Sequence, residues 1–195
     1  MIPNFNHSHV LPPFVGDSPT QSAHASPYPT TAAELVHRLG HTNDRRQILH
    51  GLLAYREALR GLGFDKGVQW IDGSFVEDVE KHQNRAPRDI DVVTFAYTPV
   101  GMDPAQVLTL ARANPTVFVP AEARARFSCD AYLVPLDGNP EKLLVRAAYY
   151  HGLFSHRRGD NVWKGMLTLP LQSDDAQALA TLARFDAGDS HAASA

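Results

Sequence analysis

A long amphipathic segment in the first third of the chain most constrains the fold. Over residues 43–62, apolar side chains recur at steps of three and four positions, namely Ile48, Leu52, Tyr55, Leu59 and Leu62. This spacing matches the 3.6-residue turn of an α-helix and gives that helix one apolar face. A helix with such a face must bury it, so we expect it to pack on a sheet or on other helices.

Helical and strand-like patterns alternate along the rest of the chain. Thr31 and Glu34 form a capping box for a short helix that ends near Gly40. Runs of β-prone residues between turn residues predict strands at 68–72, 89–95, 128–134 and 166–169. Further helical patterns start at residue 104, cover 121–126 and 141–153, and follow Ser173 to about residue 185. This alternation predicts an α+β or α/β sandwich.

Prolines are concentrated at the start of the chain. Six of them fall within residues 1–30, which excludes a long helix or a long paired strand there. The segment is either a flexible tail or an arm that lies on a domain surface. Phe5, Leu11 and Phe14 could anchor it, and we predict that it packs through them on its own domain or on a partner's equivalent surface.

The chain therefore divides into three predicted parts. These are a proline-rich arm (1–30), one globular domain (31–185) and a flexible tail (186–195). With 195 residues, of which 44% are hydrophobic and 20% charged, the chain is long enough to bury a core without metals or disulfides.

Charge and cysteine content exclude several classes of protein. The net charge of −3 weighs against a generic nucleic-acid coat, which needs a basic excess. The single cysteine, Cys129, excludes an internal disulfide and a cysteine-based zinc site, and we expect it to be a core thiol. No apolar stretch is long enough to span a membrane and no export signal is visible, so the expected location is the cytoplasm.

A glycine-serine turn follows the strand predicted at 68–72. Gly73 has no Cβ, so phosphate oxygens can approach the main-chain N–H groups around it. Ser74 adds a hydroxyl donor at the same turn. The turn is therefore a candidate phosphate-binding site.

Aspartates on two predicted strands are candidate metal ligands. Asp89 and Asp91 are two positions apart, which places both carboxylates on one face of a strand. Their repulsion is relieved by a divalent cation that prefers oxygen ligands, Mg²⁺ or Mn²⁺. With Asp130 on the next strand they form a scaffold for two-metal phosphoryl transfer. Alternatively, the pair lies at an exposed strand end or binds Arg85 and Arg88.

A polar loop near the end of the domain carries cationic side chains. Arg157 and Arg158 are adjacent in it, and Lys164 follows. Guanidinium and ammonium groups could clamp a triphosphate, and the alternative is a solvated turn. Arg124 and Arg126, just before the third predicted strand, are weaker candidates.

In this order, these motifs resemble the signature of the nucleotidyltransferase superfamily, which has the polymerase-β-like fold. The shared pattern is a Gly-Ser turn, an Asp-Ile-Asp triplet and an acid on a later strand, over roughly residues 45–135. The resemblance implies a small mixed β-sheet flanked by helices, with a nucleoside triphosphate and Mg²⁺ at one end. The spacer of 14 residues between turn and triplet is slightly long, and its acids Glu77, Asp78 and Glu80 would have to point away from a triphosphate.

The resemblance also implies a role for each residue of the signature. Gly73 and Ser74 would hold the phosphates, and Asp89 and Asp91 would bind the metal. Asp130 would bind metal or activate the attacking hydroxyl. The implied reaction moves a nucleoside monophosphate from ATP or another nucleoside triphosphate to a hydroxyl acceptor. The acceptor is a protein side chain, an RNA end or a small molecule.

The chain as a whole resembles a bacterial group of uncharacterised nucleotidyltransferase-like proteins. The proline-rich start, residues 70–76 and Lys164-Gly165 before an apolar strand carry that resemblance. It implies a toxin–antitoxin or phage-defence setting, in which a protein partner or a homo-oligomer would fit and a membrane would not. The alternative function is a catalytically inactive module of the same fold that senses nucleotides or binds another protein.

Overall fold

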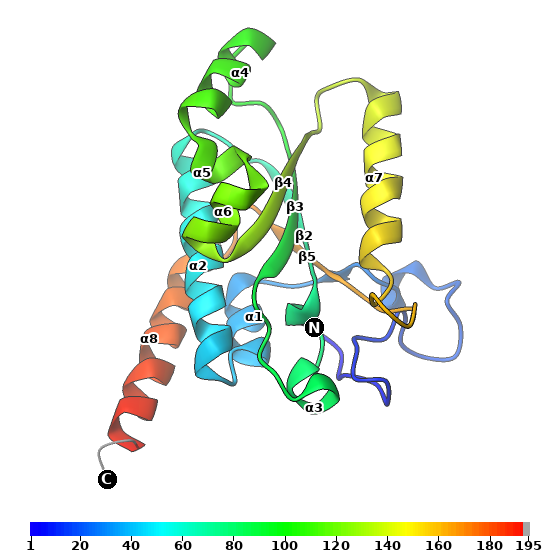
Figure 1. Cartoon of the computed structure of the whole chain (residues 1–195). Coiled ribbons are helices and arrows are strands. Elements are labelled where there is room, and N and C mark those ends of the chain that lie inside the picture. The colour runs from blue at the N-terminus through cyan, green and yellow to red at the C-terminus, as the bar shows by residue number, and fades with distance from the viewer. Residues whose placement is uncertain (193–195) are drawn as a thin grey trace.

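The computed structural model describes residues 1–192 and shows an α+β fold. Within these residues eight α-helices surround one five-stranded mixed sheet, which is open rather than closed into a barrel (Figure 1). The predicted fold class is therefore confirmed. None of the helices in this range is long and apolar enough to cross a membrane.

The sheet has the strand order β1-β5-β2-β3-β4. The strands are β1 (Tyr28–Pro29), β2 (Gly67–Asp72), β3 (Ile90–Ala96), β4 (Cys129–Pro135) and β5 (Leu167–Pro170). β2 is antiparallel to both of its neighbours, whereas β3 and β4 are parallel. A parallel pair needs a long crossover, and three helices supply it here.

Helices cover both faces of the sheet. They are α1 (Ala32–Leu39), α2 (Asn43–Gly61), α3 (Val79–Gln83), α4 (Pro104–Ala113), α5 (Pro115–Phe118), α6 (Pro120–Phe127), α7 (Pro140–Phe154) and α8 (Asp175–Ala192), with 3₁₀ turns at Ser22–His24 and Ser74–Val76. Figure 1 shows α2, α5 and α6 on one face, and α7 by itself on the other. The cavity described below lies on the α7 side.

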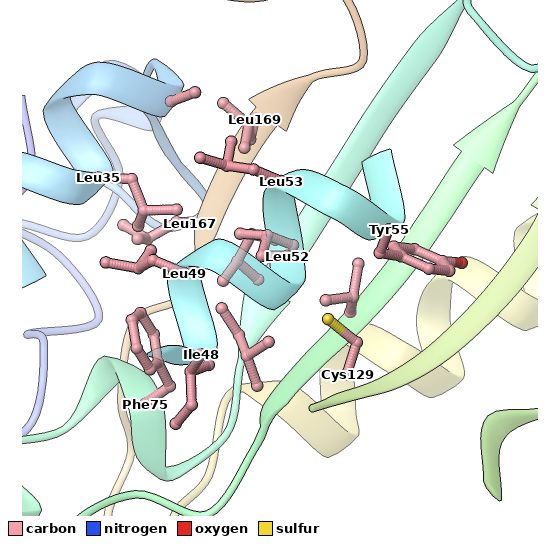
Figure 2. Close-up of a cluster of buried hydrophobic side chains, with 14 of the residues drawn as sticks. Leu35, Ile48, Leu49, Leu52, Leu53, Tyr55, Phe75, Cys129, Leu167 and Leu169 are labelled. Carbon is pink, nitrogen blue, oxygen red and sulfur yellow. The ribbon is translucent and has the colours of Figure 1, made fainter. Parts of the chain in front are cut away.

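The amphipathic segment forms α2 and holds the main core together. Figure 2 shows Leu49 and Leu53 of this helix close to Leu167 and Leu169 of β5. All four side chains are buried, and each contributes about 1.5–3 kcal/mol relative to an exposed position. Cys129 is buried in the same core, which confirms it as a core thiol.

Two predicted helix starts are confirmed by their caps. The Thr31 hydroxyl accepts the backbone N–H of Glu34 at 3.2 Å, and Asp103 forms a complete capping box at the start of α4. The elements that the sequence missed are short, namely β1, α3, α5 and the two 3₁₀ turns. Such short elements have no apolar period to reveal them.

The last helix is longer than predicted and includes residues 186–192, which were assigned to the tail. The last helix does not end near residue 185 but continues to Ala192. Asp186 accepts from Arg46 Nε at 2.8 Å and lies 3.0 Å from His50 Nε2, so ion pairs to α2 hold the helix at this point. Residues 193–195 of the predicted tail lie outside the described residues.

The proline-rich arm packs on its own domain, as predicted. Leu11 is fully buried and Phe5 packs against the main core. Phe14 is half-buried, with its ring 5.9 Å from that of Trp163. Tyr28, at the end of the arm, is buried in β1, which pairs with β5. The interpretation of this segment as a flexible tail is therefore wrong.

Candidate active site

Three aspartates form a row across the ends of three neighbouring strands. In the sheet register Asp72 of β2 is opposite Asp91 of β3, and Asp91 is beside Asp130 of β4. Side chains opposite one another in register lie on the same face of a sheet. Phe95 lies four residues after Asp91 on β3, and Tyr132 lies two residues after Asp130 on β4. Both aromatic side chains pack on the α7 face. Because side chains an even number of positions apart on a strand share a face, the aspartates lie on the α7 face too.

A glycine allows the strand end to approach this row. Gly73 has φ +83°, in the region that favours glycine, and a Cβ at this position would collide with Oδ2 of Asp91. Ser74 follows at the start of the 3₁₀ turn and is half-buried. The predicted Gly-Ser turn therefore lies directly beside the predicted metal-binding aspartate.

Arg124 bridges the remaining carboxylates. Its Nε lies 2.8 Å from Oδ2 of Asp89, and one of its terminal nitrogens donates to Oδ2 of Asp130 at 2.8 Å. Asp89 thus pairs with Arg124 of α6, and not with Arg85 or Arg88. A guanidinium occupies the place that the sequence assigned to metal. Within residues 1–192, no group of three or more His, Cys, Asp or Glu side chains has an arrangement that could hold a metal ion.

The row carries more negative charge than its neighbours neutralise. Burial, followed by the nearby charges of Asp89 and Asp130, raises the pKa of Asp91 to about 6. Burial raises the pKa of Asp72 to about 7, although the positive charge of Lys164 opposes this shift. A further cation on the cavity side would stabilise the charged form of both carboxyls and lower their pKa.

The buried side chain of Lys164 binds the Gly-Ser turn. It is almost completely buried, and its Nζ donates to Oε1 of Glu77 at 2.7 Å and to the Gly73 carbonyl at 3.2 Å. Nζ also lies 3.3 Å from Oδ1 of Asp72, at ion-pair distance but without hydrogen-bond geometry. Burial disfavours the ammonium ion, but the two carboxylates outweigh burial and raise the lysine's pKa. The ammonium is therefore bonded within the protein, at a position where Lys164 also lines the cavity described below.

The two adjacent arginines have different surroundings. Arg157 is buried, pairs with Asp160 and donates to the Ser8 carbonyl at 2.6 Å, so it fastens the arm to the loop. Arg158 is exposed and lines the cavity, and its charge opposes in part the rise in the pKa of Asp91 that burial, Asp89 and Asp130 cause. In the described part of the chain it has no ion-pair partner. Of the predicted clamp residues, Arg158 is thus the one free to bind a phosphate.

The acids of the spacer point away from the cavity or are neutralised, as a triphosphate site requires. Glu80 receives two hydrogen bonds from the buried Arg45, at 2.6 and 2.8 Å. Asp78 lies 3.0 Å from Lys81 Nζ, and Glu77 binds Lys164. Each acid of the spacer thus has a cationic partner, of which Lys81 lies in the spacer and Arg45 and Lys164 lie outside it.

A cavity of about 580 Å³ opens beside the row, a volume that suits a small molecule. Asp72, Asp89 and Asp91 contribute negative charge to its lining, and the turn at Gly73 and Ser74 also lines it. Positive charge comes from exposed or half-buried arginines in three segments, namely Arg85, Arg88, Arg124 and Arg158. The cavity thus combines cation-binding carboxylates with donors suited to phosphate. Arg126 lies instead over the ring of Phe127.

Sequence reasoning missed Asp72 and underrated Arg124. The only sequence signal for Asp72 is its position directly before the Gly-Ser turn. Its place opposite Asp91 depends on the register of β2 and β3, which a single sequence does not specify. Arg124 shares the loop and helix before β4 with Arg126, and only the tertiary structure separates the two.

Comparison with known proteins gives one match. The model of a family of unknown function, DUF6932, matches residues 3–170. The chain belongs to the DUF6932 family. The matched range includes nearly all of the arm, the five strands and every residue of the candidate site, and leaves out α8. No curated protein and no solved structure matches the chain.

Proposed function

We propose that this member of the DUF6932 family is a Mg²⁺-dependent nucleotidyltransferase. It transfers a nucleoside monophosphate from ATP, or from another nucleoside triphosphate, to a hydroxyl acceptor. The observation that carries the proposal is the row of crowded carboxylates beside the Gly73 turn, at the edge of an arginine-lined cavity. The resemblance to the polymerase-β-like superfamily supports the same reaction.

Asp89, Asp91 and Asp130 would hold a magnesium ion through carboxylate oxygens. They are not arranged to hold it while Arg124 bridges Asp89 and Asp130, so the proposal requires that this arginine moves away. Arg124 now pairs with two of them, but 53% of its side chain is exposed. Exposed ion pairs contribute about 0–1 kcal/mol, so a divalent cation can displace this arginine at small cost. When bound, Mg²⁺ lowers the pKa of an acceptor hydroxyl and neutralises phosphate charge.

The residues around the cavity bind and orient the nucleotide. Main-chain N–H groups at the Gly73 turn and the Ser74 hydroxyl donate to phosphate oxygens. Arg158, with Arg85 and Arg88 from the opposite segment, supplies positive charge to the triphosphate. These groups hold the α-phosphorus near the row of acids, where an acceptor can reach it in line.

The transfer exchanges one P–O bond for another. The acceptor oxygen forms a bond to the α-phosphorus, the bond to the bridging oxygen breaks, and pyrophosphate leaves with the electron pair. Asp130, once released by Arg124, accepts the proton of the hydroxyl. The acceptor is a protein side chain, an RNA end or a small molecule.

A second candidate function follows from the Arg124 bridge. A guanidinium of the chain itself already pairs with both Asp89 and Asp130, as expected for a module that keeps the fold without metal catalysis. Such a module would sense a nucleotide or bind another protein. It would bind nucleotide without releasing pyrophosphate.

The test is nucleotide transfer with α-labelled ATP and Mg²⁺, with pyrophosphate release measured in parallel. Candidate acceptors are the protein itself, total RNA and a pool of small hydroxyl compounds. We expect label transfer by the original protein, loss with Asp91→Asn, and no change with Asp17→Asn, an exposed aspartate in the arm. Nucleotide binding without pyrophosphate release for any acceptor would overturn the enzyme and favour the sensing module.

A further inference from the structure

The loop that carries Arg158 is held in place mainly by one buried side chain. It follows α7, covers residues 155–164, and is closed at its base by two backbone hydrogen bonds of 2.8 and 2.9 Å. Among residues 156–163, all of which the structure describes, only Arg157 is buried. A segment with so few buried contacts opens easily unless other bonds restrain it.

The guanidinium of Arg157 bonds this loop to the arm. One terminal nitrogen, Nη1, donates to the Ser8 carbonyl oxygen at 2.6 Å. Nε and Nη2 both donate to the carboxylate of Asp160, at the tip of the loop. Figure 1 shows the loop at the end of α7, next to the arm. Because a guanidinium presents its donors in a rigid fork, these two acceptors together fix its direction.

The arm segment next to Ser8 is itself fixed. The backbone N–H of Asp78 donates to the His9 carbonyl at 2.9 Å, and Val10 pairs with Glu77 in an antiparallel bridge. Val10 is also fully buried. The two spacer residues come directly after the 3₁₀ turn of the Gly-Ser motif. The arm therefore gives the loop an attachment point that is fixed relative to that turn.

Lys164 attaches the end of the loop to the same turn, through its hydrogen bond to the Gly73 carbonyl. This contact acts at the base of the loop, whereas Arg157 directly precedes Arg158 and braces the tip. Without the Arg157 side chain, the base would stay attached to the Gly-Ser turn and the tip would be free to move.

The position of Arg158 decides whether it can bind a phosphate. Its side chain is exposed and lines the cavity that the Gly-Ser turn also lines. An arginine on a mobile tip loses conformational entropy when it binds a triphosphate, and this loss weakens binding. A tip that is already held at the cavity avoids most of the loss.

We propose that Arg157 is a positioning residue for nucleotide binding. By bonding the loop to the arm at Ser8, it holds Arg158 at the cavity, where that arginine binds the triphosphate. The arm is then part of the nucleotide site, although no described residue of the arm lines the cavity. The inference rests on the proposed function, because it assigns a triphosphate to this cavity.

The test is a double-mutant cycle on the binding of a non-hydrolysable ATP analogue with Mg²⁺, measured by calorimetry. Arg158→Ala should weaken binding by about tenfold or more, as for a lost hydrogen bond to a charged group. Arg157→Ala should weaken it several-fold. Adding Arg157→Ala to Arg158→Ala should change it by less than about twofold, because Arg157 acts through Arg158.

Two further variants separate positioning from a general loss of structure. Arg157→Lys can still donate to the Ser8 carbonyl, so it should recover part of the affinity. Arg112→Ala, which removes an exposed arginine of α4 outside the cavity, should leave binding unchanged. In the label-transfer assay, Arg157→Ala should raise KM for ATP with little change in kcat.

Amide hydrogen exchange gives a readout without nucleotide. Arg157→Ala should accelerate exchange in residues 156–163 and leave α7 unchanged, whereas Arg158→Ala should change neither. Asp160→Ala makes the same test in a variant that should fold, because the Asp160 side chain is 43% exposed. It should accelerate exchange in the loop to a smaller extent.

Each readout can overturn the inference. Additive losses in the double variant would do so, as would unchanged exchange in the Arg157→Ala loop or undiminished analogue binding by Arg157→Ala. The proposed function stands in those cases if the original protein binds the analogue and transfers label. If the original protein does not bind the analogue, both the proposed function and this inference fail.

Discussion

Two clusters of buried charge behave in opposite ways in this protein. Around Arg56, which is fully buried, the guanidinium donates to both oxygens of Asp175, to Gln69 and to two backbone carbonyls, at 2.6–3.1 Å. Around Asp91 the acids outnumber their partners, and burial together with Asp89 and Asp130 raises its pKa. The carboxylate of the first cluster is fully paired within the chain, whereas the acids of the second are not fully compensated by the cations around them.

The pKa of each carboxyl reports this difference. Burial alone would raise the pKa of Asp175, but the hydrogen bonds and charges of Arg56 and Arg60 outweigh burial and lower it. Burial raises the pKa of Asp72, and Lys164 does not compensate fully. A structural cluster lowers the free energy of the folded state, whereas a binding site keeps an unfavourable charge that its ligand relieves.

The largest effect is expected when the complete cluster is broken. Asp175→Ala leaves the charge of Arg56 buried without its carboxylate, and we expect the free energy of unfolding to fall by about 3–5 kcal/mol. Urea unfolding followed by circular dichroism measures this change. A loss below 1 kcal/mol would show that the cluster is not structural, and Asp17→Asn in the exposed arm loop serves as the control.

The same cluster should make stability depend on pH in the acid range. A carboxyl whose folded-state pKa is lowered stabilises the protein above its unfolded pKa, near 3.9, and this contribution is lost as pH falls through the folded-state pKa. We therefore expect unfolding free energy to fall below about pH 4 through Asp175. Asp175→Ala should show a shallower fall over that window. Parallel curves for the two proteins would contradict the assignment.

The smallest effect on stability is expected at the incomplete cluster. Asp91→Asn removes one of several repelling acids, so in metal-free buffer it should be neutral or stabilise the fold by up to about 1 kcal/mol. Thermal and urea unfolding in the presence of a chelator measure it. A destabilisation as large as that of Asp175→Ala would mean that both clusters are structural, and the contrast between them would disappear.

Of the two clusters, only the one around Asp91 could be predicted in part from the sequence, and the one around Arg56 could not. The two-residue spacing of Asp89 and Asp91 predicts that they share a face because strand parity is local, whereas the position of Asp130 beside Asp91 depends on the register of β3 and β4. The complete cluster joins Arg56 to Asp175, which lies 119 positions further along the chain. Contacts at that separation depend on how helices and strands dock, and no local period encodes them.

The same reason explains the contacts that the sequence did not reveal. Lys164 lines the cavity with the other predicted clamp residues, and its ammonium also bonds to Glu77 and to the Gly73 carbonyl, 87 and 91 positions away. Arg124 is only six positions from Asp130, yet its bridge also needs Asp89 from another strand end. The arm was predicted to dock because its anchors are local features. Its contacts with the loop at Arg157 could not be read from composition.

The central claim is that Asp89, Asp91 and Asp130 bind Mg²⁺ in the place that Arg124 now occupies. The most direct measurement is calorimetric titration of Mg²⁺, in the presence of a non-hydrolysable ATP analogue, into the original protein, Arg124→Ala and Asp91→Asn. Removing the competing guanidinium should tighten Mg²⁺ binding by about fivefold, the equivalent of a pair worth about 1 kcal/mol, and Asp91→Asn should weaken it strongly. Weaker or unchanged Mg²⁺ binding by Arg124→Ala, or no difference between Asp91→Asn and the original protein, would contradict the account.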